Sequence, residues 1–132
     1  MTAPPANPLL SGYDALLVDL DGTVYRGGEP IGHAAEGLGC ARRAGRTVRF
    51  VTNNAARTPE TVAGRLRDLG VSAKPDEIDT SAQAAAVLLR QHGHAGDAVL
   101  VIGSEALAAE VRAVDRRPVR DNAEPVTAVV QG

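Results

Sequence analysis

The sequence predicts an α/β fold built on a doubly wound, largely parallel sheet. Short apolar runs alternate with amphipathic segments along all 132 residues, and this alternation is typical of parallel sheets covered by helices. The first run, residues 15–18 (ALLV), is apolar at every position, which favours a strand covered on both faces. Hydrophobic residues make up 44% of the chain, which is enough for a packed core and too many for a disordered protein.

A strand, a helix and a second strand come first in the chain. Residues 15–19 are the expected strand, and the glycine-rich segment 22–32 is too broken for a helix, so we interpret it as a flap or loop. Residues 33–44 fit a helix with Gly45 as its stop. Residues 47–52 (TVRFVT) fit the second strand. Because a crossover helix joins them, the two strands are expected to be parallel.

The next helix has a clear start in the sequence. Thr58 is a good N-cap, and Pro59 suits the first helical position. Three apolar residues then recur at the spacing i, i+4, i+7, which predicts one buried stripe. These residues are Val62, Leu66 and Leu69.

The rest of the chain continues the alternation of strands and helices. Ser81 is expected to cap a helix. Gly103 and Ser104 are interpreted as a helix start, because they lack the lysine of a phosphate-binding P-loop. The expected strands are residues 77–80, 97–103 and 126–130, and the expected helices are residues 81–91 and 104–114. Because a strand directly precedes Gly132, we expect the sequence to be part of a longer α/β protein.

Composition and charge argue against several classes of function. The net charge of −2 gives no reason to expect a nucleic-acid partner, and no apolar stretch approaches the length that spans a membrane. Residues 1–12 are expected to form a disordered lead-in, and residues 1–8 lack the features of a signal peptide. A single cysteine, Cys40, excludes an intrachain disulfide and fits a reducing cytoplasm. We expect Cys40 to be a small buried residue of its helix.

Two carboxylates stand at the end of the first expected strand. Asp19 and Asp21 are two residues apart, and Gly22 and Thr23 then break the apolar run. Open parallel sheets bind their ligands at the carboxyl ends of the strands. One carboxylate could therefore act as a nucleophile and the other as a general acid and base, with a cation between them and a phosphate.

The second expected strand also ends in a polar cluster, Thr52, Asn53 and Asn54. Hydroxyl, amide and backbone N–H groups bind phosphate, so a site that uses a carboxylate nucleophile would need them here. Two plainer interpretations stay open, a solvated turn for the acids and a loop with Asx turns for residues 52–54. An EF-hand calcium loop is excluded, because its glycine at the sixth position would place Leu17 at the first.

These motifs resemble those of a known family of phosphatases. Residues 19–24 (DLDGTV) resemble the first signature of the haloacid-dehalogenase-like (HAD) phosphatases. Residues 51–54 (VTNN) resemble the second signature, in the form used by subfamily IIA, the NagD-like or p-nitrophenylphosphatase group. The stretches 79–82 (DTSA) and 101–104 (VIGS) are similar to that group as well. The resemblance covers about residues 13–132.

The resemblance implies a Mg²⁺-dependent phosphomonoester hydrolase that acts through an aspartyl-phosphate intermediate. Asp19 would be the nucleophile, and Asp21 would be the general acid and base. The Asp19 carboxylate and the Asp21 backbone carbonyl would hold the Mg²⁺ ion. Gly22, Thr52 and the Asn53 backbone would bind the substrate phosphate.

The resemblance also implies a domain organisation. Residues 13–81 would form the N-terminal half of a HAD-like Rossmannoid core, and residues 82–132 would form the truncated start of a C2-type α/β cap domain. The family's later lysine and acidic motif have no counterpart here, because Lys74 is the only lysine and stands too early. We therefore expect a fragment of an enzyme, inactive when residues 1–132 are isolated.

Two other functions stay open at the level of sequence. One is a catalytically incompetent phosphate- or metal-binding fragment, with a regulatory role or no independent role. The other is a receiver-type phosphoacceptor, which also uses a strand-end aspartate. The expected partner is a small phosphorylated metabolite such as glycerol phosphate or phosphoglycolate, and unpaired strand edges favour a homo-oligomer.

Overall fold

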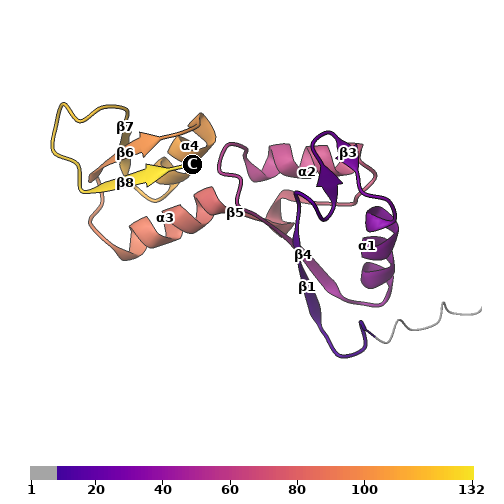
Figure 1. Ribbon diagram of the computed structural model, residues 1–132. Coiled ribbons are helices and arrows are strands. Elements are labelled where there is room, and N and C mark those ends of the chain that lie inside the picture. Colours follow the sequence, from indigo (N-terminus) through magenta and orange to yellow (C-terminus); the bar gives the residue numbers. More distant parts are fainter. Residues whose placement is uncertain (1–8) are drawn as a thin grey trace, which may run out of the picture. The chain divides into compact units, whose positions relative to one another are not determined.

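The computed structural model describes residues 9–132, so most of the expected lead-in at residues 1–12 lies outside the described residues. Helices and strands alternate along the chain (Figure 1), which confirms the predicted α/β class with parallel sheets. Contacts within the chain divide it into two compact units. The first holds the chain up to Val51 together with Glu60–Ile78, and the second holds Thr52–Pro59 and Asp79–Gly132.

A parallel sheet in the order β1-β4-β5 runs through the first part of the chain. In the parallel register of β1 and β4, Ala15 lies opposite Thr47 and Asp19 lies opposite Val51. The segment expected to be a flap contains a short antiparallel hairpin, β2 and β3. The elements are β1 (Ala15–Asp19), β2 (Tyr25–Arg26), β3 (Glu29–Pro30), α1 (Ala34–Arg43), β4 (Thr47–Thr52), α2 (Pro59–Asp68), the 3₁₀ helix η1 (Pro75–Glu77) and β5 (Ile78–Thr80).

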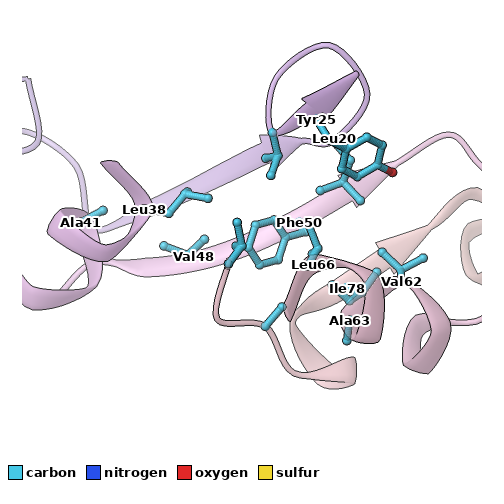
Figure 2. Close-up of a cluster of buried hydrophobic side chains, with 13 residues drawn as sticks. Leu20, Tyr25, Leu38, Ala41, Val48, Phe50, Val62, Ala63, Leu66 and Ile78 are labelled. Atoms are coloured by element: carbon cyan, nitrogen blue, oxygen red, sulfur yellow. The ribbon is translucent and has the colours of Figure 1, made fainter. Parts of the chain in front are cut away.

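The core of the first unit forms where β4 packs against α2. Phe50 of β4 is fully buried beside Leu66 of α2 and Leu20, which follows β1 (Figure 2). The stripe predicted for α2 is confirmed, because Val62 and Leu66 are buried and Leu69 packs against the same cluster. Complete burial of an apolar side chain contributes roughly 1.5–3 kcal/mol of stability. Leu20 and Phe50 therefore anchor the carboxyl ends of β1 and β4 in this cluster.

A second parallel sheet, in the order β7-β6-β8, lies in the second unit. Leu100 of the central strand lies opposite Val119 of β7 and Val129 of β8. Buried valines of β6 pack against buried residues of α4, among them Val101 against Leu107 in the same cluster. The elements are α3 (Ser81–Gln91), β6 (Ala98–Ile102), α4 (Glu105–Ala113), β7 (Arg117–Val119) and β8 (Ala128–Gln131). The short strand β7 was not expected from the sequence.

The expectation that the first strand is covered on both faces is wrong. Leu16 and Val18 pack partly buried against the core, but Leu17 is 74% exposed. Successive side chains of a strand point to opposite faces, and only one face of β1 is packed. Within residues 9–132, β1 has a single strand neighbour, β4, so it stands at the edge of its sheet.

Two expectations about helix residues are also corrected. Thr80, not Ser81, is the N-cap of α3: its hydroxyl accepts from Gln83 N at 3.2 Å, and Gln83 Oε1 accepts from Thr80 N at 2.9 Å. This reciprocal pair is a capping box, and it makes Ser81 the first helical residue. Cys40 is exposed, and its sulfur accepts from Arg43 at 3.0 Å. Because the buried face of α1 carries Leu38, a residue two positions later points away from the core.

Candidate active site

A buried leucine separates the two predicted catalytic carboxylates. Leu20 is fully buried in the core of the first unit, whereas Asp19 and Asp21 on either side of it are exposed. Residues on either side of an inward-pointing strand residue point the opposite way. Anchoring Leu20 therefore presents both carboxylates to solvent at the carboxyl end of β1.

The turn after Asp21 is held by its backbone. The carbonyl oxygen of Leu20 accepts from Thr23 N, Val24 N and Tyr25 N at 3.2, 2.9 and 3.2 Å, and Gly22 N donates to Tyr25 O at 2.7 Å. Gly22 has φ +87°, in the left-handed region, and an added Cβ there would meet nothing within 4 Å. The turn therefore requires glycine for its backbone conformation rather than for space.

The β2–β3 hairpin that follows this turn is attached to α2. The guanidinium of Arg65 lies over the ring of Tyr25, 4.4 Å from its centroid, and also donates to the carbonyl oxygen of Gly27. Stacking of a guanidinium on an aromatic ring is favourable by roughly 0.5–1 kcal/mol at an exposed site. Arg65 thus holds the hairpin beside the acidic turn, and the sequence pattern did not identify this role.

The polar cluster after β4 folds into two consecutive side-chain turns. The buried Thr52 accepts at Oγ1 from Asn54 N at 3.2 Å, and Asn54 Oδ1 accepts from Ala56 N at 2.8 Å. Asn53 and Asn54 are themselves exposed. The plain interpretation of this segment as a loop with side-chain turns is therefore correct for its conformation. Such a loop can still bind a phosphate through its hydroxyl and backbone N–H groups.

Two serines that the sequence marked only as helix starts also contact this loop. Ser81 Oγ donates to Asn53 O at 2.8 Å, and Ser104 Oγ donates to Ala55 O at 3.1 Å. The DTSA and VIGS stretches marked both positions as part of the family pattern, but nothing local in the sequence showed what the hydroxyls contact.

Chain register relates the two motifs. Asp19 lies opposite Val51 in the parallel pairing of β1 and β4, and Thr52 is the residue after Val51. Asp19 is the last residue of β1 and Thr52 is the last residue of β4, so each motif begins at the carboxyl end of its own strand, as the sequence predicted. Asp19, Asp21 and Gly22 belong to the first unit, and Thr52 and Asn53 belong to the second.

The acidic turn offers oxygen donors of the kind that suits Mg²⁺. This ion is usually bound by one or two carboxylates together with water and substrate phosphate, and the Asp19 carboxylate with the Asp21 backbone carbonyl fits that donor set. Among the described residues, no group of three or more His, Cys, Asp or Glu side chains could hold a metal ion.

The only lysine of the sequence, Lys74, is the N-cap residue of η1. Its backbone N donates to the Glu77 carboxylate at 2.9 Å.

A cavity of about 580 Å³ lies along β1 and the start of α1. Its lining is mostly apolar, including Leu16, Leu38 and Val24, and it includes Asp19 and Thr23 among its polar members. Specific phosphate sites use converging donors, so this apolar lining does not by itself make a phosphate site.

Residues 16–117 match the family model described as haloacid dehalogenase-like hydrolase. The chain belongs to this family. The match spans both motifs and both units, so the HAD resemblance that residues 19–24 and 51–54 predicted is confirmed.

Individual relatives agree with the family assignment. The D-glycerol 3-phosphate phosphatase of Mycobacterium tuberculosis is 48% identical over 120 residues, which cover 91% of this chain and 33% of that protein. A crystal structure of glycerol phosphate phosphatase from the same organism, in complex with magnesium, superposes with a TM-score of 0.88 at 46% identity, over 94% of this chain and 37% of that one. NagD from E. coli K-12 superposes with a TM-score of 0.78 at 26% identity, over 90% of this chain and 46% of that one. These similarities confirm the NagD-like group.

The HAD chain described here spans about a third of the length of the curated relatives it matches. Within residues 9–132, none of the helices combines the length and the apolar character that crossing a membrane requires.

Proposed function

We propose that this HAD-family protein is a Mg²⁺-dependent phosphomonoester hydrolase that works through an aspartyl-phosphate. One observation carries the proposal: Asp19 and Asp21 flank the buried Leu20 at the end of β1, and Asp19 lies opposite the residue that precedes Thr52. A nucleophile, a proton donor and a phosphate-binding hydroxyl thus follow the ends of neighbouring strands. The phosphatase relatives support the same chemistry.

In the first step, a carboxylate oxygen of Asp19 attacks phosphorus. The new Asp19 O–P bond forms as the bond from phosphorus to the ester oxygen breaks, and Asp21 gives its proton to the leaving alkoxide. In the second step, Asp21 takes a proton from water, and the water oxygen attacks phosphorus. The aspartyl O–P bond breaks, inorganic phosphate leaves, and both carboxyl groups return to their starting state.

The phosphoryl group is proposed to bind at the Thr52 hydroxyl, the Asn53 backbone N–H and Gly22. Thr52 Oγ1 already accepts from Asn54 N, and a hydroxyl that accepts one bond keeps its own proton for donation. Mg²⁺, held by the Asp19 carboxylate and the Asp21 backbone carbonyl, would neutralise charge on the phosphoryl oxygens. The proposed substrate is a small phosphorylated metabolite, because the relatives are named for glycerol 3-phosphate and acid sugars.

We also propose that residues 13–81 form the N-terminal half of the catalytic core and that residues 82–132 begin a cap domain. The change of unit between Ile78 and Asp79 supports this division. The Thr52–Pro59 loop lies within residues 13–81 of the sequence. Its contacts nevertheless assign it to the second unit.

Phosphate release from glycerol 3-phosphate with Mg²⁺, measured on the complete enzyme rather than on isolated residues 1–132, tests the proposed function. Asp19→Asn removes the nucleophile and should abolish release, and Asp21→Asn should lower the rate by about 10²- to 10⁴-fold, the usual contribution of general acid–base catalysis. Asp76→Asn, at an exposed position of η1, is the matched control and should leave the rate unchanged.

Two further outcomes separate the alternatives. Binding of Mg²⁺ and orthophosphate without release would favour the catalytically incompetent binding protein. Release that continues unchanged in Asp19→Asn, or the absence of both binding and release, would overturn the proposed function.

A further inference from the structure

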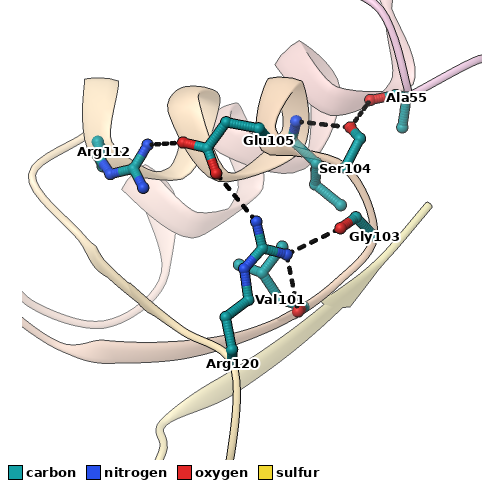
Figure 3. A network of polar contacts seen from close by, with 8 residues as sticks. Ala55, Val101, Gly103, Ser104, Glu105, Arg112 and Arg120 are labelled. Carbon is teal, nitrogen blue, oxygen red and sulfur yellow. Dashed lines mark hydrogen bonds and ion pairs between the residues drawn. The ribbon is translucent and has the colours of Figure 1, made fainter.

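Two serine hydroxyls from two different helix starts hold the backbone of the loop after β4. Ser81 is the first residue of α3, and its Oγ donates to Asn53 O at 2.8 Å. Ser104 is the N-cap of α4, and its Oγ donates to Ala55 O at 3.1 Å (Figure 3). The loop and both serines lie in the second unit. Two carbonyl groups of one short loop are therefore held by side chains 28 and 49 residues away in the sequence.

The bond from Ser81 reaches Thr52 through one peptide group. The Asn53 carbonyl and the Asn54 N–H belong to the same planar unit, so fixing the carbonyl also fixes the direction of the N–H. That N–H donates to Thr52 Oγ1 at 3.2 Å. The Ser81 hydroxyl thereby orients the hydrogen bond from Asn54 N to Thr52 Oγ1. Because Thr52 Oγ1 accepts this bond with a lone pair, its own proton stays available for another acceptor.

The bond from Ser104 likewise fixes one peptide group, in the second of the two side-chain turns of this loop. The Ala55 carbonyl shares its peptide plane with the Ala56 N–H, which donates to Asn54 Oδ1 at 2.8 Å. Ala55 is buried in the hydrophobic cluster of the second unit. Ser81 and Ser104 therefore start two separate hydrogen-bonded branches, one that ends at the Thr52 hydroxyl and one that ends at the Asn54 side chain. Linked bonds within each branch strengthen one another.

The turn that carries Ser104 is itself braced. Arg120 donates to Gly103 O at 2.8 Å and to Glu105 Oε2 at 3.1 Å, and Glu105 Oε1 accepts from Arg112 at 2.5 Å (Figure 3). An added Cβ on Gly103 would overlap the carbonyl oxygen of Gly132, so this position of the turn accepts no side chain. Ser104 is thus presented to the loop from a turn that these contacts hold.

We propose that Ser81 and Ser104 are positioning residues for the phosphate-binding loop, acting on substrate phosphate through Thr52 and Asn54 rather than by contact. The proposal rests on the proposed function, because it assigns these hydroxyls to the same phosphate site. Its first consequence concerns the loop alone: the Asn54 and Ala56 amides should be protected from solvent exchange by the two serines. Its second consequence is that orthophosphate binding should depend on Ser81.

A structural role has to be separated from positioning at Ser104, because this residue also caps α4. Its Oγ accepts from Leu107 N at 3.2 Å while donating to Ala55 O. Ser104→Asp keeps a good N-cap acceptor but has no proton to donate when ionised. Ser104→Thr keeps both functions. The pair therefore isolates the bond to the loop from the cap of the helix.

Amide exchange measured by NMR on residues 1–132, without phosphate, tests the first consequence. Ser81→Ala should raise exchange of the Asn54 amide about fivefold, and Ser104→Asp should raise that of the Ala56 amide about fivefold, as expected for one lost hydrogen bond. Ser81→Thr and Ser104→Thr should restore the wild-type rates. Unchanged exchange in both Ser81→Ala and Ser104→Asp, with folded spectra, would overturn the proposal.

Titration with orthophosphate and Mg²⁺, followed by the same amide signals, tests the second consequence. Ser81→Ala should weaken orthophosphate binding about fivefold, and Ser81→Thr should bind as the wild type does. Faster exchange with wild-type affinity in Ser81→Ala would overturn the assignment to phosphate binding. If the wild-type protein binds no orthophosphate, the proposed phosphate site fails, whereas the exchange rates still decide whether the serines hold the loop.

Discussion

At the scale of single residues, Leu20 and Gly22 decide where the carboxylates of the acidic turn lie. Leu20 is fully buried, and its carbonyl oxygen collects three backbone N–H groups of the turn. Gly22 supplies a left-handed φ of +87° that lets the chain reverse directly after Asp21. Neither residue has a reactive side chain, yet both shape the turn that carries Asp19 and Asp21.

Gly22→Ala should lower the free energy of unfolding by about 1–2 kcal/mol, because a side chain disfavours the left-handed conformation by that amount. Urea unfolding followed by circular dichroism measures the change. Gly28→Ala is the matched control: this glycine of the same segment lacks a positive φ and has open space around it, so its substitution should cost little. Equal stability of the two variants would contradict the conformational role of Gly22.

Glu77 of η1 provides a pH-dependent contact in the first unit. Arg42 of α1 donates to its carboxylate from both terminal guanidinium nitrogens, at 2.7 and 3.1 Å. The hydrogen bond from Arg42 is the main cause that holds the pKa of Glu77 below its ordinary value of 4.5, against the opposing effect of burial. Because the folded state favours the charged form, Glu77 stabilises the protein above pH 4.5, and this contribution is lost as the pH falls through the lowered pKa.

Glu77→Gln should therefore lower the free energy of unfolding at pH 7 by about 1 kcal/mol. The difference from the wild type should persist down to about pH 5 and shrink as the pH falls below 4.5, the ordinary pKa of this carboxyl group. Urea unfolding at a series of pH values measures it. A difference that stays constant down to pH 3 would show that the charge of Glu77 is not responsible.

At the scale of elements, helix starts do more than begin helices in this chain. Thr80 caps α3 with its side chain, which frees Ser81 to donate to the loop after β4. Ser104 does both at the start of α4. Each N-terminus of these two helices thus provides one hydroxyl for the same loop, and capping and loop contact can be separated by substitution.

Thr80→Ala should lower the free energy of unfolding by about 1 kcal/mol, the usual effect of losing an N-cap. Thr80→Ser keeps the acceptor oxygen and should cost much less. Thermal unfolding of the three proteins provides the comparison. If Ser and Ala were equally destabilising at this position, the lost methyl group rather than the cap would explain the effect.

At the scale of the whole molecule, the edge of the first sheet carries an exposed apolar side chain. β1 ends the sheet order β1-β4-β5, and Leu17 on it is 74% exposed. An exposed edge strand with an apolar side chain is a template for pairing with another chain. The β1 edge is therefore one place where a second copy of the chain could pair with this sheet.

Leu17→Lys should lower self-association of residues 1–132, because a lysine on an edge strand opposes pairing. Sedimentation velocity over a range of concentrations measures the weight-average mass. Leu88→Lys is the control, since Leu88 is 58% exposed on a helix rather than on a strand edge. An equal effect of the two substitutions would mean that general surface charge, not the β1 edge, controls association.

The sequence alone determined the family and the longer local elements, but not the short strands β2, β3 and β7. Apolar runs predicted β1, β4 and β6, the spacing of Val62, Leu66 and Leu69 predicted the buried face of α2, and the two motifs predicted a HAD phosphatase. These signals succeed because periodicity, glycine stops and caps act over one or two turns of chain. The parallel pairing of β1 with β4 also followed, because a crossover helix leaves little choice.

Only the tertiary structure decided which faces are covered and which side chains hold the loop. Leu17 lies on an open face, although it belongs to the apolar run 15–18, because burial depends on what packs above the strand. Ser81 and Ser104 reach the loop from 28 and 49 residues away, and the Thr52–Pro59 segment joins the second unit rather than the first. Contacts of that range arise from packing of whole elements, and local sequence patterns do not encode them.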